Sequence, residues 1–271
     1  MGEAGAAADD LRALADGRGP GSLLAASFGA QTLGDLALED DLLAALGRSA
    51  PFFAYPFERR SFLAFDRDDA LTAAEALTVA IELEPDSDLY WTNLGWARYL
   101  LGDLTGSETA SRRALEVDPN QFIARYNLGL VQVVTGRLEA ALADYADAVL
   151  ADPDVDDEAI ADLVAAETLY PTAVGVPYAL GFLLEREGER EAAADAYARY
   201  VDLATANPAA PDAERVDEAR AQIEALRAPP PPIEVLGTPQ VSLSPRSPAL
   251  ETVQPGDPLT VSFEVSTPGD A

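Results

Sequence analysis

The stretch NLGWARYLLGDLTGSETASRRALEVDP, residues 93–119, decides the fold of this chain, because residues 127–153, NLGLVQVVTGRLEAALADYADAVLADP, repeat its pattern. Both stretches begin with Asn-Leu-Gly and end with Asp-Pro, and they are 34 residues apart. Working outward, Pro85 and Pro51 continue the register of the two closing prolines at the same interval. A period of this length is typical of stacked helical repeats.

The small residues of each unit have a physical role. Gly95, Gly129 and Gly181 in one half, and Ala141 and Ala193 in the other, stand where two helices approach too closely for a bulky side chain. Large apolar residues at helical spacing fill the rest of the contact face. A glycine at the turn supplies a left-handed cap, and the closing proline stands where a helix must end. Since one helix pair cannot bury its own apolar faces, neighbouring pairs must stack.

These units resemble the tetratricopeptide repeat (TPR), whose signature is W-x2-L-G-x2-Y, then A-x3-F, then P. The matching residues are Trp91-x2-Leu94-Gly95, Arg125-x2-Leu128-Gly129, Ala141-x3-Tyr145, Leu180-Gly181 and Ala193-x3-Tyr197. Arg98 stands where the family has tyrosine. The resemblance implies helix–turn–helix units, with partner contacts made from the first helix of each unit.

We therefore expect an all-α, right-handed TPR-type solenoid of four to five helix pairs plus a capping helix, with a short β-rich C-terminal segment. The predicted parts are a helical lead-in (1–19), a degenerate helix pair (20–53), three TPR units (54–155), an inserted single helix (156–173), a further TPR unit (174–207), a capping helix (208–228), a polyproline linker (229–232) and the β-rich segment (233–271).

The repeat register breaks once. Only 18 residues separate Pro153 from Pro171, and Ala159-x3-Leu163 with Ala166 matches a second helix that has no first helix before it. Two explanations stay open at this point: a single helix is inserted, or the preceding helix of a full unit is missing.

The C-terminal segment has a different composition. After Pro229-Pro230-Pro231-Pro232, the run from Leu259 to Ser266 alternates apolar and polar residues, which favours a strand. This segment weakly resembles the first strands of a bacterial immunoglobulin-like domain. Such a sandwich needs roughly 100 residues, so we expect either a truncated domain or pairing with another segment.

Composition excludes several classes of function. The chain has 271 residues, 47 acidic against 18 basic, no His and no Cys, and all of its basic residues are arginine. It therefore lacks imidazole bases, thiolates and the lysines of Schiff-base and P-loop sites. A net charge of −29 argues against binding to nucleic acid or to an anionic membrane.

Sequence features also bear on localisation. No apolar run approaches the roughly 18 residues of a membrane span, and no signal peptide is visible. We expect no membrane insertion by this chain. The expected location is the cytoplasm, or the cell envelope if the chain is a fragment of a longer protein.

The resemblance places candidate binding residues on the first helices of the repeats. They form an apolar, aromatic groove for an apolar peptide or an amphipathic helix of a partner protein. The predicted groove residues are Leu89, Thr92, Trp96, Tyr99, Ile123, Tyr126, Leu130, Val133, Tyr178 and Phe182. The family's carboxylate clamp needs lysine as well as asparagine, so Asn93 and Asn127 alone do not predict one.

Three alternatives compete with an open groove. The aromatic flank Phe52-Phe53-Ala54-Tyr55, the proline-rich tail or the inserted helix could each cover it.

No catalytic or metal site is predicted, and no cofactor. Asp152, Asp154, Asp156, Asp157 and Glu158 form an acidic cluster, but Pro153 interrupts it and the glycine of a calcium loop is missing. Acidic residues at a helix start are ordinarily explained by capping and the helix dipole. Acidic pairs such as Asp40-Asp41 are expected by chance in so acidic a chain.

The predicted function is a non-catalytic protein–protein interaction scaffold. The alternative is that the chain is the soluble TPR portion of a larger envelope protein, such as the tail of a membrane glycan ligase or polymerase, with a regulatory or localising role.

Overall fold

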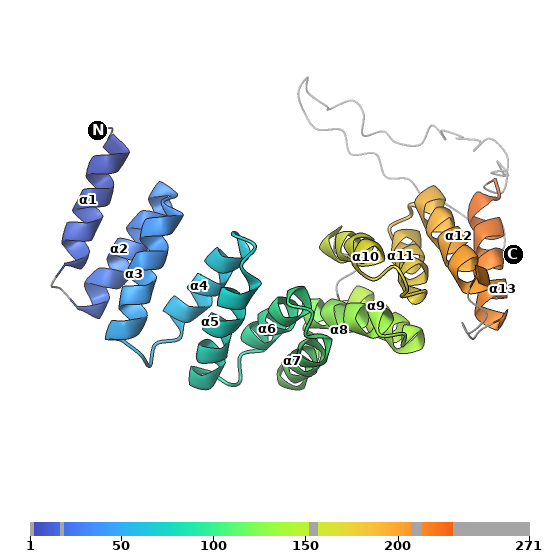
Figure 1. The fold of residues 1–271 in the computed structure, drawn as a ribbon, viewed down its shortest axis with the longest axis horizontal. Helices are drawn as coiled ribbons and strands as arrows, with labels where there is room; N and C mark the ends of the chain where they lie inside the picture. Colours follow the sequence, from blue (N-terminus) through green and yellow to red (C-terminus); the bar gives the residue numbers. More distant parts are fainter. Residues whose placement is uncertain (1–2, 17–18, 152–156, 207–212, 230–271) are drawn as a thin grey trace, which may run out of the picture. The chain divides into compact units, whose positions relative to one another are not determined.

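The computed structural model describes residues 3–16, 19–151, 157–206 and 213–229, and within these ranges it contains helices and no strand. The chain divides into two units, Met1–Ala228 and Pro229–Ala271, and the helices all belong to the first (Figure 1). The all-α prediction is therefore confirmed for the described part of the chain. The predicted β-rich segment, 233–271, lies outside the described residues.

The helices follow the repeat pattern of the sequence. Their bounds are α1 Glu3–Ala15, α2 Pro20–Leu33, α3 Leu36–Ser49, α4 Tyr55–Phe65, α5 Ala70–Leu83, α6 Asp88–Leu100, α7 Leu104–Val117, α8 Phe122–Val134, α9 Leu138–Ala151, α10 Asp157–Leu169, α11 Gly175–Arg186, α12 Arg190–Ala206 and α13 Ala213–Arg227. Within the array, α2 packs on α3, α4 on α5, α6 on α7, α8 on α9 and α11 on α12. These five pairs are antiparallel hairpins with short turns, as expected of a TPR-type solenoid. At the two ends, α1 packs on α2 and α13 packs on α12.

Close helix approaches explain the glycines inside the hairpins. A Cβ atom on Gly129 would lie 2.7 Å from Cε1 of Tyr145, and one on Gly181 would lie 2.9 Å from the ring of Tyr197. Both tyrosines are buried. The predicted reason for these glycines, a helix contact too close for a side chain, is therefore confirmed by the structure.

The hairpin turns share a left-handed residue. In four of the five described hairpins it is a glycine with φ of 70–82°, as at Gly102 and Gly136, but in the α4–α5 turn Asp68 occupies it with a φ of 56°. The residue after it often caps the next helix. Asp103, for example, accepts a hydrogen bond from the Gly106 backbone N–H at 2.9 Å.

Helix α10 is not part of the continuous stack of hairpins. The next hairpin, starting with α11, packs directly on both α8 and α9, so the array continues from α9 to α11. The N-terminus of α11 lies close to both helices, because a Cβ on Gly175 would be 3.1 Å from Val133 and 3.4 Å from Leu138. In contrast, α10 packs on α8 and α11. Among the described residues, α10 therefore lies between two hairpins without forming a hairpin of its own.

A single hydrophobic core joins α10 to its neighbours. Ala159, Leu163 and Ala166 of α10 are buried in the same cluster as Tyr126 of α8 and Tyr145 of α9. Their spacing puts all three on one face of α10. The helix is therefore held by its apolar face, and its other faces remain available for different contacts.

Candidate functional site

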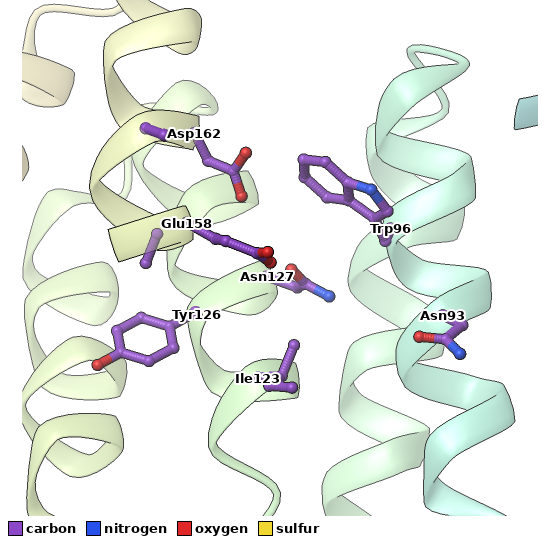
Figure 2. A pocket seen from close by; sticks show the side chains of 9 residues that line it. Asn93, Trp96, Ile123, Tyr126, Asn127, Glu158 and Asp162 are labelled. Atoms are coloured by element: carbon purple, nitrogen blue, oxygen red, sulfur yellow. The ribbon is translucent and has the colours of Figure 1, made fainter. Parts of the chain in front are cut away.

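A pocket opens between α6, α8 and α10. Its volume is about 350 Å³, within the range of small-molecule and side-chain binding sites. The lining residues are Asn93 and Trp96 from α6, Ile123, Tyr126 and Asn127 from α8, and Glu158, Ala159, Ala161 and Asp162 from α10 (Figure 2).

Two carboxylates from α10 form one wall of the pocket. Glu158 and Asp162 are four residues apart, so they lie on the same side of α10, next to the buried face that carries Ala159 and Leu163. Figure 2 shows both carboxylates pointing from α10 toward α6. The packing of the apolar face thereby fixes where the two charges are presented.

Trp96 forms the opposite wall. Its indole points from α6 toward Asp162 (Figure 2) and is half-buried. The ring is stacked on Tyr99, with centroids 5.4 Å apart and an interplanar angle of 17°. Tyr99 is itself buried and contacts Tyr170, which follows α10, at a centroid distance of 6.2 Å. The indole is thus supported from behind, while its other side faces the pocket.

The pocket floor contains two amides. Asn127 is buried and donates from Nδ2 to the Thr92 backbone carbonyl at 3.4 Å. The Nδ2 atom of Asn93 is also buried, and it has no hydrogen-bond partner among the described residues. A buried donor without a partner costs free energy, so a ligand carbonyl at this position would be stabilised.

The negative charge of Asp162 affects two buried tyrosines of the adjoining core. Burial, followed by the negative charge of Asp162, raises the pKa of Tyr145 well above its usual value. Burial also raises the pKa of Tyr99, with Tyr170 and Asp162 as further causes. Both phenols therefore stay neutral at physiological pH.

The ten predicted groove residues do not form one open surface. Six of them are no more than 6% exposed: Thr92, Tyr99, Tyr126, Leu130, Val133 and Tyr178. They are core residues because adjacent hairpins and α10 pack on them. Leu89 and Ile123 are about two-fifths exposed, at 38% and 41%, and Trp96 and Phe182 are half-buried. The side chains that a partner could reach are therefore these four.

Only two of these four accessible side chains line the pocket. Trp96 and Ile123 line the pocket, along with one edge of Tyr126. Phe182 lies on α11 and carries the Arg186 guanidinium 3.3 Å above its ring. Tyr178 packs edge-on against Tyr197 and Tyr200. Phe182 and Tyr178 of α11 therefore make these contacts and do not line the pocket.

Sequence reasoning did not assign Glu158 and Asp162 to the groove. They come from α10, which the repeat numbering does not cover. Their spacing of four residues beside Ala159-x3-Leu163 was the available signal, because it places them next to the buried face.

The other features considered from sequence lie elsewhere. Of the aromatic flank, Phe53 stacks on Tyr55 at 5.8 Å, and Tyr55 contacts Phe28 of α2 at 5.6 Å. None of these rings lines the pocket. The proline-rich tail and Asp152, Asp154 and Asp156 lie outside the described residues.

The described residues also bear on metal binding and membrane insertion. In that part of the chain, no group of three or more acidic side chains is arranged to hold a metal ion. None of the helices described is long and apolar enough to span a membrane.

Comparison with known proteins supports the repeat assignment. Residues 89–121 match the family model described as "Tetratricopeptide repeat". The solved structure of PilW, described as a widely conserved type IV pilus biogenesis factor, aligns with a TM-score of 0.50 and 19% identity, over 76% of this chain and 92% of PilW. No curated protein sequence matches the chain.

Two further structures align less well. MamA aligns with a TM-score of 0.47 and 17% identity, over 72% of this chain and 96% of MamA. YrrB, described as a TPR protein with an unusual peptide-binding site, aligns with a TM-score of 0.47 and 14% identity, over 74% of this chain and 91% of YrrB. The described helices and the matching family model show a TPR-type helical solenoid, and the PilW structure has the same type of fold.

Proposed function

We propose that this chain is a non-catalytic interaction scaffold that binds a segment of a partner protein at the α6–α8–α10 pocket. The observation that carries the proposal is the arrangement of Trp96 and Ile123, two accessible apolar side chains from consecutive first helices, around a hollow of about 350 Å³. Apolar hollows with a few convergent polar groups are the usual form of a binding site.

The volume and lining of the pocket suit side chains of a peptide. Ala159 and Ala161 leave space on the α10 side, while Trp96 supplies a large, rigid aromatic area. Aromatic residues of this kind dominate the binding energy of interfaces. Trp96 is therefore expected to be the main anchor, with Ile123 extending the apolar contact.

A non-catalytic role fits the same residues. The pocket is lined by amide, aromatic, aliphatic and carboxylate side chains, and the chain as a whole has no His, Cys or Lys to act as a base or nucleophile. The repeat fold supports a role in protein interaction. The alternative predicted from sequence, the soluble portion of a larger envelope protein, stays a prediction.

A tryptophan pair on α6 provides the test. Affinity capture from lysate of the source cells, followed by mass spectrometry, would compare the wild-type chain with Trp96→Ala and Trp91→Ala. Trp91 is also half-buried on α6, but it packs in a different cluster and does not line the pocket. We expect Trp96→Ala to lose partners that Trp91→Ala retains. Equal yields of every partner from Trp96→Ala and the wild type would contradict the proposal.

A further inference from the structure

We infer that the α6–α8–α10 pocket selects a basic side chain, preferentially arginine, within an apolar segment of the partner protein. This inference rests on the proposed function and adds the chemistry of the ligand. The juxtaposition that carries it is an aromatic ring facing two carboxylates across a hollow that an arginine side chain can enter.

The geometry of the walls fits a guanidinium group. Trp96 offers one ring face to the pocket, since Tyr99 covers the other side. Cations stack favourably on tryptophan, and arginine does so most often. Glu158 and Asp162 point toward the same space from α10 (Figure 2). An arginine inserted between the walls could stack on the indole and donate hydrogen bonds to carboxylate oxygens.

The chain already contains this arrangement once, made from its own residues. The Arg215 guanidinium lies 5.1 Å from the centre of the Tyr178 ring. The same side chain donates to Glu218 at 2.8 Å and also pairs with Glu139. One arginine thus combines an aromatic face with two carboxylates between α13 and its neighbours. The pocket likewise places two carboxylates opposite an aromatic ring, so an arginine of a bound peptide would meet the same kinds of group.

The remaining groups of the pocket suit the backbone and flanking residues of a peptide. Asn93 Nδ2 is a buried donor without a partner in the described part of the chain, so it can donate to a peptide carbonyl. Ile123, 41% exposed, offers an apolar contact beside it. We therefore expect the arginine to be flanked by aliphatic or aromatic residues.

Charge favours the same choice of ligand. The lining residues include two carboxylates and no cationic side chain. A peptide bound by its terminal carboxylate would face like charges there. The net charge of −29 also attracts basic segments at a distance and speeds their association.

The test starts by selecting binding peptides from a library, so that no peptide sequence is assumed. A random peptide library displayed on phage is panned against the full chain, and the most enriched peptide is synthesised in two forms, with arginine and with the neutral isostere citrulline. Binding of both forms is measured by calorimetry to the wild type and to three variants. The variants are the pocket double substitution Glu158→Gln/Asp162→Asn, the control Glu75→Gln/Glu82→Gln on α5, and Trp96→Ala. Glu75 and Glu82 are exposed and do not line the pocket.

We expect enriched peptides to contain a basic residue next to apolar ones. Citrulline should weaken binding to the wild type about tenfold. The pocket double substitution should weaken the arginine peptide by a similar factor and leave the citrulline peptide unchanged, while the α5 control changes neither. Thermal unfolding of each variant shows whether the fold is retained.

Other outcomes overturn the inference. If enriched peptides lack basic residues, or if citrulline binds equally well, the charge selection is wrong. Should those peptides still lose binding with Trp96→Ala, the proposed function stands. Peptides whose binding is unaffected by Trp96→Ala bind elsewhere, and a selection that enriches no peptide contradicts the inference. The capture experiment then decides the proposed function separately.

Discussion

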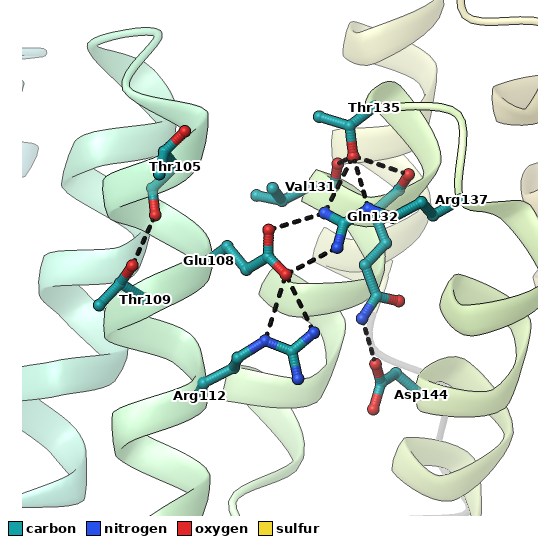
Figure 3. Close-up of polar contacts among 9 residues, drawn as sticks. All are labelled: Thr105, Glu108, Thr109, Arg112, Val131, Gln132, Thr135, Arg137 and Asp144. Carbon is teal, nitrogen blue, oxygen red and sulfur yellow. Dashed lines mark hydrogen bonds and ion pairs between the residues drawn. The ribbon is translucent and has the colours of Figure 1, made fainter.

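The two carboxylate oxygens of Glu108 each accept a hydrogen bond at 2.7 Å from the guanidinium of Arg137 (Figure 3). Glu108 lies on α7, and Arg137 immediately precedes α9, so the pair connects two consecutive hairpins. Arg112 also donates to Glu108, at 2.9 Å. Bidentate pairs of this kind are the strongest form of the arginine–carboxylate contact. The interface between these repeats therefore has an electrostatic component in addition to apolar packing.

This pair predicts a pH dependence of stability. The hydrogen bond from Arg137, followed in effect by Arg112, lowers the pKa of Glu108 from 4.5 to about 2. Since the folded-state pKa is depressed, the contribution is present above about pH 4.5 and is lost as pH falls toward 2. After allowance for solvent screening at this partly exposed site, we expect about 1 kcal/mol.

Urea unfolding between pH 7 and pH 2.5 measures this contribution. Glu108→Gln should lower the free energy of unfolding at pH 7 by about 1 kcal/mol, and most of this difference from the wild type should disappear near pH 2.5. Glu75→Gln, an exposed glutamate on α5, is the control. An equal effect of Glu108→Gln at both pH values would contradict the assignment.

The helix contact at Gly129 predicts a large loss of stability. In Gly129→Ala, the new methyl group would lie 2.7 Å from Cε1 of Tyr145, which is 1% exposed and cannot move aside without disturbing the core. We expect the free energy of unfolding to fall by about 2–3 kcal/mol. Gly21→Ala, in α2, is the matched control because nothing lies within 4 Å of its Cβ position. It should be neutral or stabilising by up to about 1 kcal/mol.

At Asp68, a substitution is expected to raise the free energy of unfolding. It is the described residue other than glycine that has a positive φ, 56°, at a turn position where Gly102 has 75°. Glycine adopts this region without the Cβ penalty. Asp68→Gly should therefore raise the free energy of unfolding by about 0.5 kcal/mol, whereas Gly102→Ala should lower it by about 1 kcal/mol. A loss of stability in Asp68→Gly would show that the aspartate side chain contributes more than its backbone strain costs.

The attachment of α10 can be tested by a neighbouring pair of residues. Leu163 is fully buried in the core shared with α8 and α9, and Val164 is 50% exposed. Leu163→Ala should lower the free energy of unfolding by about 2–4 kcal/mol, and Val164→Ala by less than about 0.5 kcal/mol. If the two substitutions have equally small effects, α10 is not an integral part of the core, and the pocket wall that it forms is not fixed.

Periodicity explains why most of the fold could be predicted. Helix contacts within a hairpin are local in sequence, so Gly95, Gly129 and Gly181 reveal them directly. The break in register between Pro153 and Pro171 indicated that something differs there. It could not indicate where the extra helix packs, because the contacts of α10 with α8 and α11 are determined by which apolar faces remain uncovered after the hairpins stack.

The binding residues illustrate the same limit. Family numbering treats Trp96 and Leu130 as equivalent positions, yet Trp96 is half-buried at the pocket while Leu130 is 2% exposed. The difference arises because α10 packs over α8, and one repeat position therefore becomes core.

By itself, the sequence determined the hairpins, their close contacts and the acidity of the chain, since these follow from residue types at fixed local spacing. Only the tertiary structure decided that α10 closes part of the first-helix face and brings Glu158 and Asp162 opposite Trp96. That pairing joins residues more than 60 positions apart, and it exists because buried apolar contacts fix the orientation of α10.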